Sequence, residues 1–118
     1  MKKIFFIISL TISAFTIYSC NTSSPEDFFE EIPEGQLVTF NTDVQPILSS
    51  SCVECHGGDF PAEGLSLESF EEAVNGVQNR NVLNRIINVD NPMPPSGLLP
   101  SQVTDIIFQW VEDGLLEE

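Results

Sequence analysis

Three side chains able to bond to a metal or a reactive cofactor stand close together in the stretch Cys52-Val53-Glu54-Cys55-His56. The pattern Cys-x-x-Cys-His is the attachment signature of c-type haem. Two thiols at this spacing can add to the two vinyl groups on one edge of a porphyrin, and the imidazole of the next residue can then reach the iron. We therefore expect Cys52 and Cys55 to form thioether bonds and His56 to be an axial ligand.

Two other chemistries use part of this motif. A redox-active Cys-x-x-Cys pair usually lies at the strand-to-helix junction of a βαβ unit, and no such alternation follows the motif here. A structural zinc site needs four well-placed ligands. The chain holds one His and three Cys in all, and the third Cys, Cys20, lies far from the motif. Both alternatives are therefore weaker than haem attachment.

A second axial ligand follows by elimination. Residues 1–19 have the pattern of a cleaved signal peptide, which is described below. Without them the chain has no Lys, no Tyr and no second His, and Met93 is its one methionine. Met93 lies in the segment 90–97, which three prolines keep out of a helix. A thioether ligand would favour the ferrous state and raise the reduction potential. The alternative is a methionine that fills a gap in the core.

The N-terminus has the pattern of a secretory signal. Lys2 and Lys3 precede an apolar run over residues 4–18, which is shorter than the roughly 20 residues that a bilayer-spanning helix needs. The end of the run resembles a bacterial lipobox, so we expect residues 1–19 to be cleaved and Cys20 to be lipidated. Lipidation of Cys20 also leaves a matched pair of thiols for the haem. A signal without lipid and an uncleaved anchor are the alternatives.

Composition limits the partners. Removing residues 1–19 leaves an acidic segment 20–39, which we expect to be a tether, and one domain over residues 40–118. The remaining chain has two basic residues, Arg80 and Arg85, and eighteen Asp and Glu, which gives a formal charge of −16. Nucleic acid and anionic lipid surfaces both require basic patches, so they are poor partners. A basic redox protein suits this charge, although acidity that only keeps the protein soluble explains it equally well.

Four short helices are expected. The first begins near Phe40 with Asn41 or Thr42 as its cap, and it leads into the Cys-x-x-Cys-His motif. The second covers residues 65–76. Its expected cap is Ser66 or Ser69, and its expected end is Gly76. The apolar residues of these two helices are Val44, Ile47, Leu48, Leu67, Phe70, Ala73 and Val74.

The third helix is expected over residues 81–88 and the last over residues 101–114. Ser101 is the expected cap of the last helix and Gly114 its end. Trp110 lies on the apolar stripe and should pack on a haem or on the first helix. The apolar residues expected to be buried are Val82, Leu83, Ile86 and Ile87 in the third helix, and Val103, Ile106, Ile107, Trp110 and Val111 in the last.

From about Phe40 to Gly114 the chain resembles class I mono-haem cytochromes c, in particular the planctomycete-type cytochrome c domains of bacterial secreted proteins. The resemblance rests on the ordered set Asp43-Val44-Gln45-Pro46-Ile47-Leu48, Cys52-Val53-Glu54-Cys55-His56-Gly57, Gly64-Leu65-Ser66-Leu67-Glu68-Ser69, Met93-Pro94-Pro95 and Ile107-Phe108-Gln109-Trp110-Val111-Glu112-Asp113-Gly114.

This resemblance implies a small all-α fold of about four helices around one covalently bound haem c, with the terminal helices packed together. It implies thioether bonds at Cys52 and Cys55, His56 as the proximal iron ligand and Met93 as the distal one. Arg80 or Arg85 could then pair with a haem propionate, or either could form a surface salt bridge.

The expected function is that of a one-electron carrier in the envelope of a bacterium, held to a membrane at a periplasmic or outer surface through Cys20. The chain offers no Ser-His-acid set, no Lys beyond the signal and no second His for substrate chemistry. A haem enzyme or small-ligand sensor, peroxidase-like or gas-binding, is the alternative if Met93 leaves the iron open. A structural or docking lipoprotein is the third hypothesis.

Overall fold

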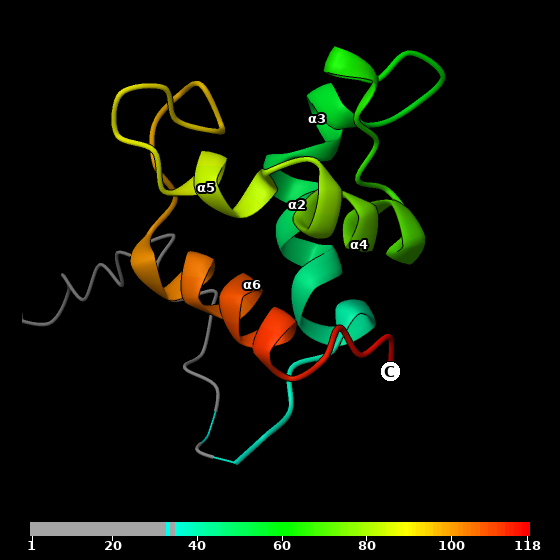
Figure 1. Cartoon of the computed structure of the whole chain (residues 1–118), viewed down its shortest axis with the longest axis vertical. Coiled ribbons are helices and arrows are strands. Elements are labelled where there is room, and N and C mark those ends of the chain that lie inside the picture. Colours follow the sequence, from blue (N-terminus) through cyan, green and yellow to red (C-terminus); the bar gives the residue numbers. More distant parts are fainter. Residues whose placement is uncertain (1–32, 34) are drawn as a thin grey trace, which may run out of the picture.

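The computed structural model describes residue 33 and residues 35–118 (Figure 1). The expected signal peptide, the expected lipidation site Cys20 and most of the expected tether lie outside these residues. In chain order the elements are the π-helix η2 (Phe40–Val44), α2 (Gln45–Ser51), α3 (Val53–His56), the 3-10 helix η3 (Ala62–Gly64), α4 (Phe70–Asn79), α5 (Val82–Ile86) and α6 (Ser101–Glu112). This part of the chain holds one isolated bridge, between Thr39 and Leu116, and no strand. The all-α fold is therefore confirmed.

The first and last helices pack together around three aromatic rings. The ring of Trp110 on α6 lies 5.8 Å from that of Phe40 on η2 and 6.2 Å from that of Phe70 on α4, measured between centroids. Trp110 is fully buried, and its indole N–H donates to the carbonyl of Leu116 at 2.8 Å. Of the two packing partners expected for Trp110, the structure therefore shows the first helix. Figure 1 shows α6 (orange) beside this first helical segment.

The beginning of the first helix differs from the expected cap. The helix starts at Phe40, as expected, but its N-cap residue is Thr39 and not Asn41 or Thr42. The Thr39 hydroxyl does not cap; instead the Asp43 carboxylate accepts the Thr39 N–H at 2.8 Å. The three expected apolar residues are buried: Val44, Ile47 and Leu48.

The segment before η2 is tied to the end of the chain. Val38 is fully buried, and its N–H donates to the Asp113 carboxylate at 2.8 Å. The Phe40 N–H donates to the carbonyl of Leu116 at 2.8 Å. The two ends of the domain therefore hold each other in place.

Helix α4 begins where one of the two expected caps is found. The Ser69 hydroxyl accepts the N–H of Glu72, and the Glu72 carboxylate accepts the N–H of Ser69, which together form a capping box. Residues 65–68 are not helical, so the expected start at Leu65 is wrong. The hydroxyl and carboxylate satisfy free N–H groups of the first turn, and this fixes the start at Phe70.

Gly76 does not end this helix, contrary to the expectation. It is buried within α4, and a β-carbon at this position would lie 2.7 Å from Leu67 Cδ2 and 3.2 Å from Val82 Cγ2. The glycine therefore permits α4 to approach the residues on either side of it closely. The helix continues to Asn79 because Gly costs only about 1 kcal/mol in a helix interior.

Gly76→Ala should destabilise the protein by up to about 2 kcal/mol, because overpacking costs roughly 1–3 kcal/mol and a gain of about 1 kcal/mol in helix propensity offsets part of it. Gln78→Ala is the matched control, since Gln78 is exposed on the same helix. Urea denaturation of both variants measures the difference. A Gly76→Ala protein as stable as the Gln78→Ala protein would contradict the close approach.

Glu72→Ala should destabilise the protein by up to about 1 kcal/mol at neutral pH, the usual size of an N-cap contribution. The hydrogen bond from the Ser69 backbone N–H, the largest of several, lowers the pKa of Glu72 from its ordinary value of 4.5. The contribution is therefore present above pH 4.5, and it is lost as the pH falls through the lower folded-state value. Denaturation at a series of pH values should show the difference in stability between Glu72→Ala and the parent disappearing in acid, whereas the non-titrating control Gln78→Ala, at an exposed position of the same helix, should show no such change.

The last two helices are shorter than expected: α5 covers Val82–Ile86 and α6 covers Ser101–Glu112. Helix α5 ends at Ile86, so Ile87 leaves the buried face and is 51% exposed, which corrects the expected burial. Helix α6 is preceded by Pro100 as its N-cap residue, and Ser101 makes no capping bond, contrary to the expectation. Gly114, with a φ of +96°, follows the helix end as expected. Val82 and Ile86 are buried, as are Val103, Ile106, Ile107 and Trp110, while Leu83 and Val111 are partly buried.

Candidate functional site

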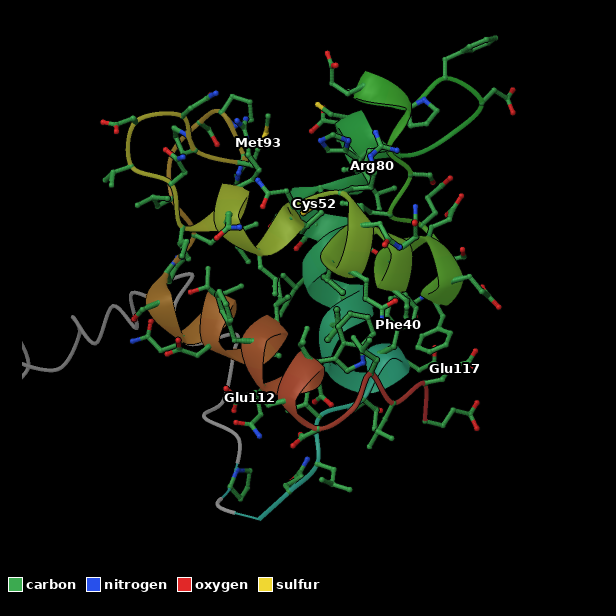
Figure 2. All side chains as sticks on the ribbon, in the orientation of Figure 1. Phe40, Cys52, Arg80, Met93, Glu112 and Glu117 are labelled. Atoms are coloured by element: carbon green, nitrogen blue, oxygen red, sulfur yellow. The ribbon has the colours of Figure 1, made fainter. Side chains whose placement is uncertain are left out.

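A cavity of about 440 Å³ brings the expected ligand residues together. Figure 2 shows Met93, on the loop after α5, and Cys52, at the start of α3, on the same side of the molecule. The volume falls within the roughly 300–1,000 Å³ of small-molecule and cofactor sites. The lining residues are Cys52, His56, Glu63, Leu65, Leu67, Arg80, Asn81, Val82, Arg85, Ile86 and Met93.

The motif forms a single helical turn between α2 and the loop that follows α3. The Cys52 N–H donates to the Leu48 carbonyl at 2.8 Å, and the His56 N–H donates to the Cys52 carbonyl at 2.8 Å. Residues four apart share one face of a helix, so Cys52 and His56 both reach the cavity. Cys55 is exposed and is not among the lining residues.

The two thiols of the motif differ from those of a redox disulfide. Both are free, and burial raises the pKa of the Cys52 thiol to about 11, so this thiol is protonated at neutral pH. Reactive cysteines of Cys-x-x-Cys oxidoreductases have lowered pKa values, because the thiolate is the nucleophile. The environment of Cys52 therefore argues against a redox-disulfide function.

The ring of His56 is oriented by a backbone carbonyl. His56 Nδ1 lies 3.1 Å from the Leu65 carbonyl oxygen, and the Leu67 N–H donates to the His56 carbonyl at 2.8 Å. Because a carbonyl can only accept, Nδ1 carries the proton, and Nε2 keeps its lone pair for a metal. The loop after α3 thus selects the imidazole tautomer that an iron ligand requires.

Glycine and an acidic side chain hold this loop close to α3. A β-carbon on Gly57 would lie 2.7 Å from the Val53 carbonyl oxygen, so only glycine fits here. The Gly58 N–H donates to the Glu68 carboxylate at 2.8 Å. The chain can therefore turn immediately after His56 and return with Leu65.

Met93 lies on a loop that is fastened to the end of α5. Its N–H donates to the Arg85 carbonyl at 3.2 Å, and the Asn88 side-chain oxygen accepts the N–H groups of Asp90 and Asn91, both at 2.9 Å. Met93 is half-buried and lines the cavity, but it does not belong to the hydrophobic core cluster. This position argues against a methionine that only fills a gap in the core.

The lining of the cavity fits a haem. The imidazole of His56 and the thioether of Met93 are the donor pair of His/Met-ligated haem iron, and these two residues would hold the metal. The apolar side chains that could contact a macrocycle are those of Leu65, Leu67, Val82 and Ile86. In the part of the chain that the structure describes, no group of three or more His, Cys, Asp or Glu side chains is placed to hold a metal ion by itself.

Several residues at the cavity could not be assigned to it from sequence. The Leu65 carbonyl that orients His56 is a backbone group, and any residue type would supply it. Leu67 was expected on a helix, but it precedes α4 and reaches the cavity from an irregular segment. Val82 and Ile86 were expected to be buried, and the sequence pattern could not show which apolar residues face a cofactor.

Comparison with known protein families gives one match. The family model of planctomycete cytochrome c matches residues 52–97, a segment that begins at Cys52 and includes His56 and Met93. The comparisons with curated proteins and with solved structures each gave no match. Among the described residues, no helix is long and apolar enough to cross a bilayer. The matched segment is therefore similar to a planctomycete-type cytochrome c domain, and this similarity suggests haem c as the cofactor and electron transfer rather than enzymatic catalysis.

Proposed function

We propose that this planctomycete-type cytochrome c domain carries one covalent haem c and acts as a one-electron carrier outside the cytoplasm, with His56 and Met93 as the iron ligands. The observation that carries the proposal is that Cys52, His56 and Met93 line one cavity although Met93 is distant in sequence. Bound haem would supply an iron that alternates between the ferric and ferrous states.

The residues of the chain have separate tasks in this proposal. Cys52 and Cys55 anchor the porphyrin through thioether bonds. His56 presents Nε2 because its Nδ1–H is held by the Leu65 carbonyl. Met93 supplies a soft ligand that favours ferrous iron, and the apolar lining keeps water away from the macrocycle.

The character of the lining supports a carrier rather than a haem enzyme. The lining has no second His and no Lys, and its one carboxylate, Glu63, is exposed. General acid–base catalysis needs a titratable group held beside the reacting atoms. An iron whose two axial positions are both occupied by protein ligands, in a cavity without an acid or base for catalysis, is suited to electron transfer alone.

The proposed location and partner follow from the N-terminus and the charge. Cleavage before Cys20 and lipidation of Cys20 would hold the domain at a membrane of the bacterial envelope, on a tether that is shorter than the expected residues 20–39 because Val38 is already buried in the domain. The net charge of −16 that remains after cleavage favours a basic redox protein as partner, because charge complementarity accelerates encounter. Rates of electron exchange with such a protein should fall as salt is added.

Haem staining of the denatured protein, together with its intact mass, tests the proposal. We expect a stained band and a mass equal to the polypeptide plus one haem, and Cys52→Ser/Cys55→Ser should not stain. A mass equal to the bare polypeptide would overturn the proposal. A high-spin resting iron that binds carbon monoxide readily would instead favour the haem enzyme or gas sensor, and a haem that no partner reduces quickly would favour the docking lipoprotein.

A further inference from the structure

Both cations of the described residues line the same cavity. Arg80 and Arg85 are the only Arg or Lys beyond residue 3, in a chain with 18 Asp and Glu. Cations surrounded by so many carboxylates would ordinarily form surface ion pairs. In the described part of the chain neither guanidinium pairs with a carboxylate, and this leaves two positive charges at the cavity.

The guanidinium of Arg80 is already engaged by the backbone. Its two terminal nitrogens donate to the carbonyls of Glu63 at 2.9 Å and Gly64 at 3.4 Å. These carbonyls belong to η3, whose residues Glu63 and Gly64 both have positive φ. Arg80, which is exposed, therefore fastens η3 to the end of α4 at the edge of the cavity.

Arg85 has no such partner. Its side chain is half-buried and lines the cavity, and it makes no hydrogen bond to a described residue. Every buried side-chain nitrogen or oxygen among these residues does have a hydrogen-bond partner. The guanidinium nitrogens of Arg85 are therefore open to the space around them, with their five N–H donors free.

The backbone places Arg85 next to the expected iron ligand. Its carbonyl accepts the N–H of Met93 at 3.2 Å, so the two residues are fixed to each other on one wall of the cavity. A haem carries two propionate carboxylates, and a planar guanidinium binds a carboxylate through two parallel hydrogen bonds. A half-buried cation without a partner in the protein is thus matched to a carboxylate on the ligand.

We propose that Arg85 forms an anion subsite that binds a haem propionate, and that Arg80 instead positions η3 at the cavity edge. This inference rests on the proposed function, since it requires haem in the cavity. The positive charge of Arg85 near the iron would favour the ferrous state. Its loss would therefore lower the reduction potential.

The test compares the full-length haem-loaded proteins Arg85→Gln, Arg85→Lys and Arg80→Gln with the parent, after the haem content of each is measured. We expect Arg85→Gln to shift the propionate-bending band in the resonance Raman spectrum and to lower the midpoint potential. Arg85→Lys should keep the potential close to that of the parent but shift the band, because an ammonium cannot bind in the bidentate geometry. Arg80→Gln should leave the band in place.

An unchanged propionate band in the Arg85 variants would overturn the inference, and so would an Arg80→Gln band shift as large as that of Arg85→Gln. If Arg85→Gln does not load haem, Arg85→Lys decides the question by the same band. Absence of haem from the parent would instead overturn the proposed function. The two failures are therefore distinguishable.

Discussion

Met93→Ala should convert the protein from a closed, low-spin cytochrome into one with an open iron. We expect loss of the ferric charge-transfer band that is typical of Met ligation, and binding of carbon monoxide. We also expect the midpoint potential to fall by about 0.2–0.3 V, since axial ligands set haem potentials over a range of ~0.8 V. The physical reason is that a thioether stabilises ferrous iron more than ferric iron. Optical spectra and redox titration measure these changes.

Leu98→Ala is the matched control for this substitution. Leu98 lies on the same loop and is 46% exposed, and it does not line the cavity. Its truncation removes a comparable side chain without removing a candidate ligand, so spectra and potential should stay close to those of the parent. A Met93→Ala protein that keeps the charge-transfer band would show that a group other than Met93 is the second axial ligand. A parent protein without this band would show that Met93 does not bind the iron.

The ligand types could be predicted from the sequence because few residues in it can perform this chemistry. The motif itself sets the spacing of Cys52 and His56, and one helical turn brings both to the cavity. Met93 could be proposed by elimination, since the chain after residue 19 holds no other methionine. The carbonyl that orients His56 could not be predicted, because a backbone group carries no sequence signal. Nor could the open guanidinium of Arg85, which depends on how the chain folds around it.

The helices could be predicted where local side chains determine them. The α4 cap at Ser69 follows from a serine and a glutamate three residues apart, which bond to each other's backbone. Gly76 was expected as a helix end because glycine is common at helix ends. In the structure it lies inside α4, where the absence of a side chain allows Leu67, from outside the helix, to pack closely against it. Ile87 was expected in the core because the apolar pattern continues past Ile86, where α5 already ends. A contact between elements therefore accounts for the first error, and the earlier end of α5 accounts for the second.

Trp110→Ala should have the largest effect on stability. Trp110 is fully buried, its ring contacts Phe40 and Phe70, and its indole N–H bonds to the Leu116 carbonyl. Replacing a buried aromatic residue by Ala costs about 3–5 kcal/mol, and small domains are stable by roughly 5–15 kcal/mol in total. We therefore expect a variant that loses most of its stability, measured by urea or thermal denaturation of the haem-loaded protein.

Two comparisons separate the contributions of Trp110. Phe108→Ala, at a partly buried position on the same helix, should cost clearly less, and an equal loss would contradict a central role for Trp110. Trp110→Phe keeps an aromatic ring but removes the indole donor from the Leu116 carbonyl, which still accepts the Phe40 N–H, so the lost hydrogen bond should cost about 0.5–1.5 kcal/mol. Because Trp110 does not line the cavity, the molecules of each variant that remain folded should keep the parent's haem spectrum. A changed spectrum in folded Trp110→Phe would mean that the junction of η2 and α6 also shapes the haem site.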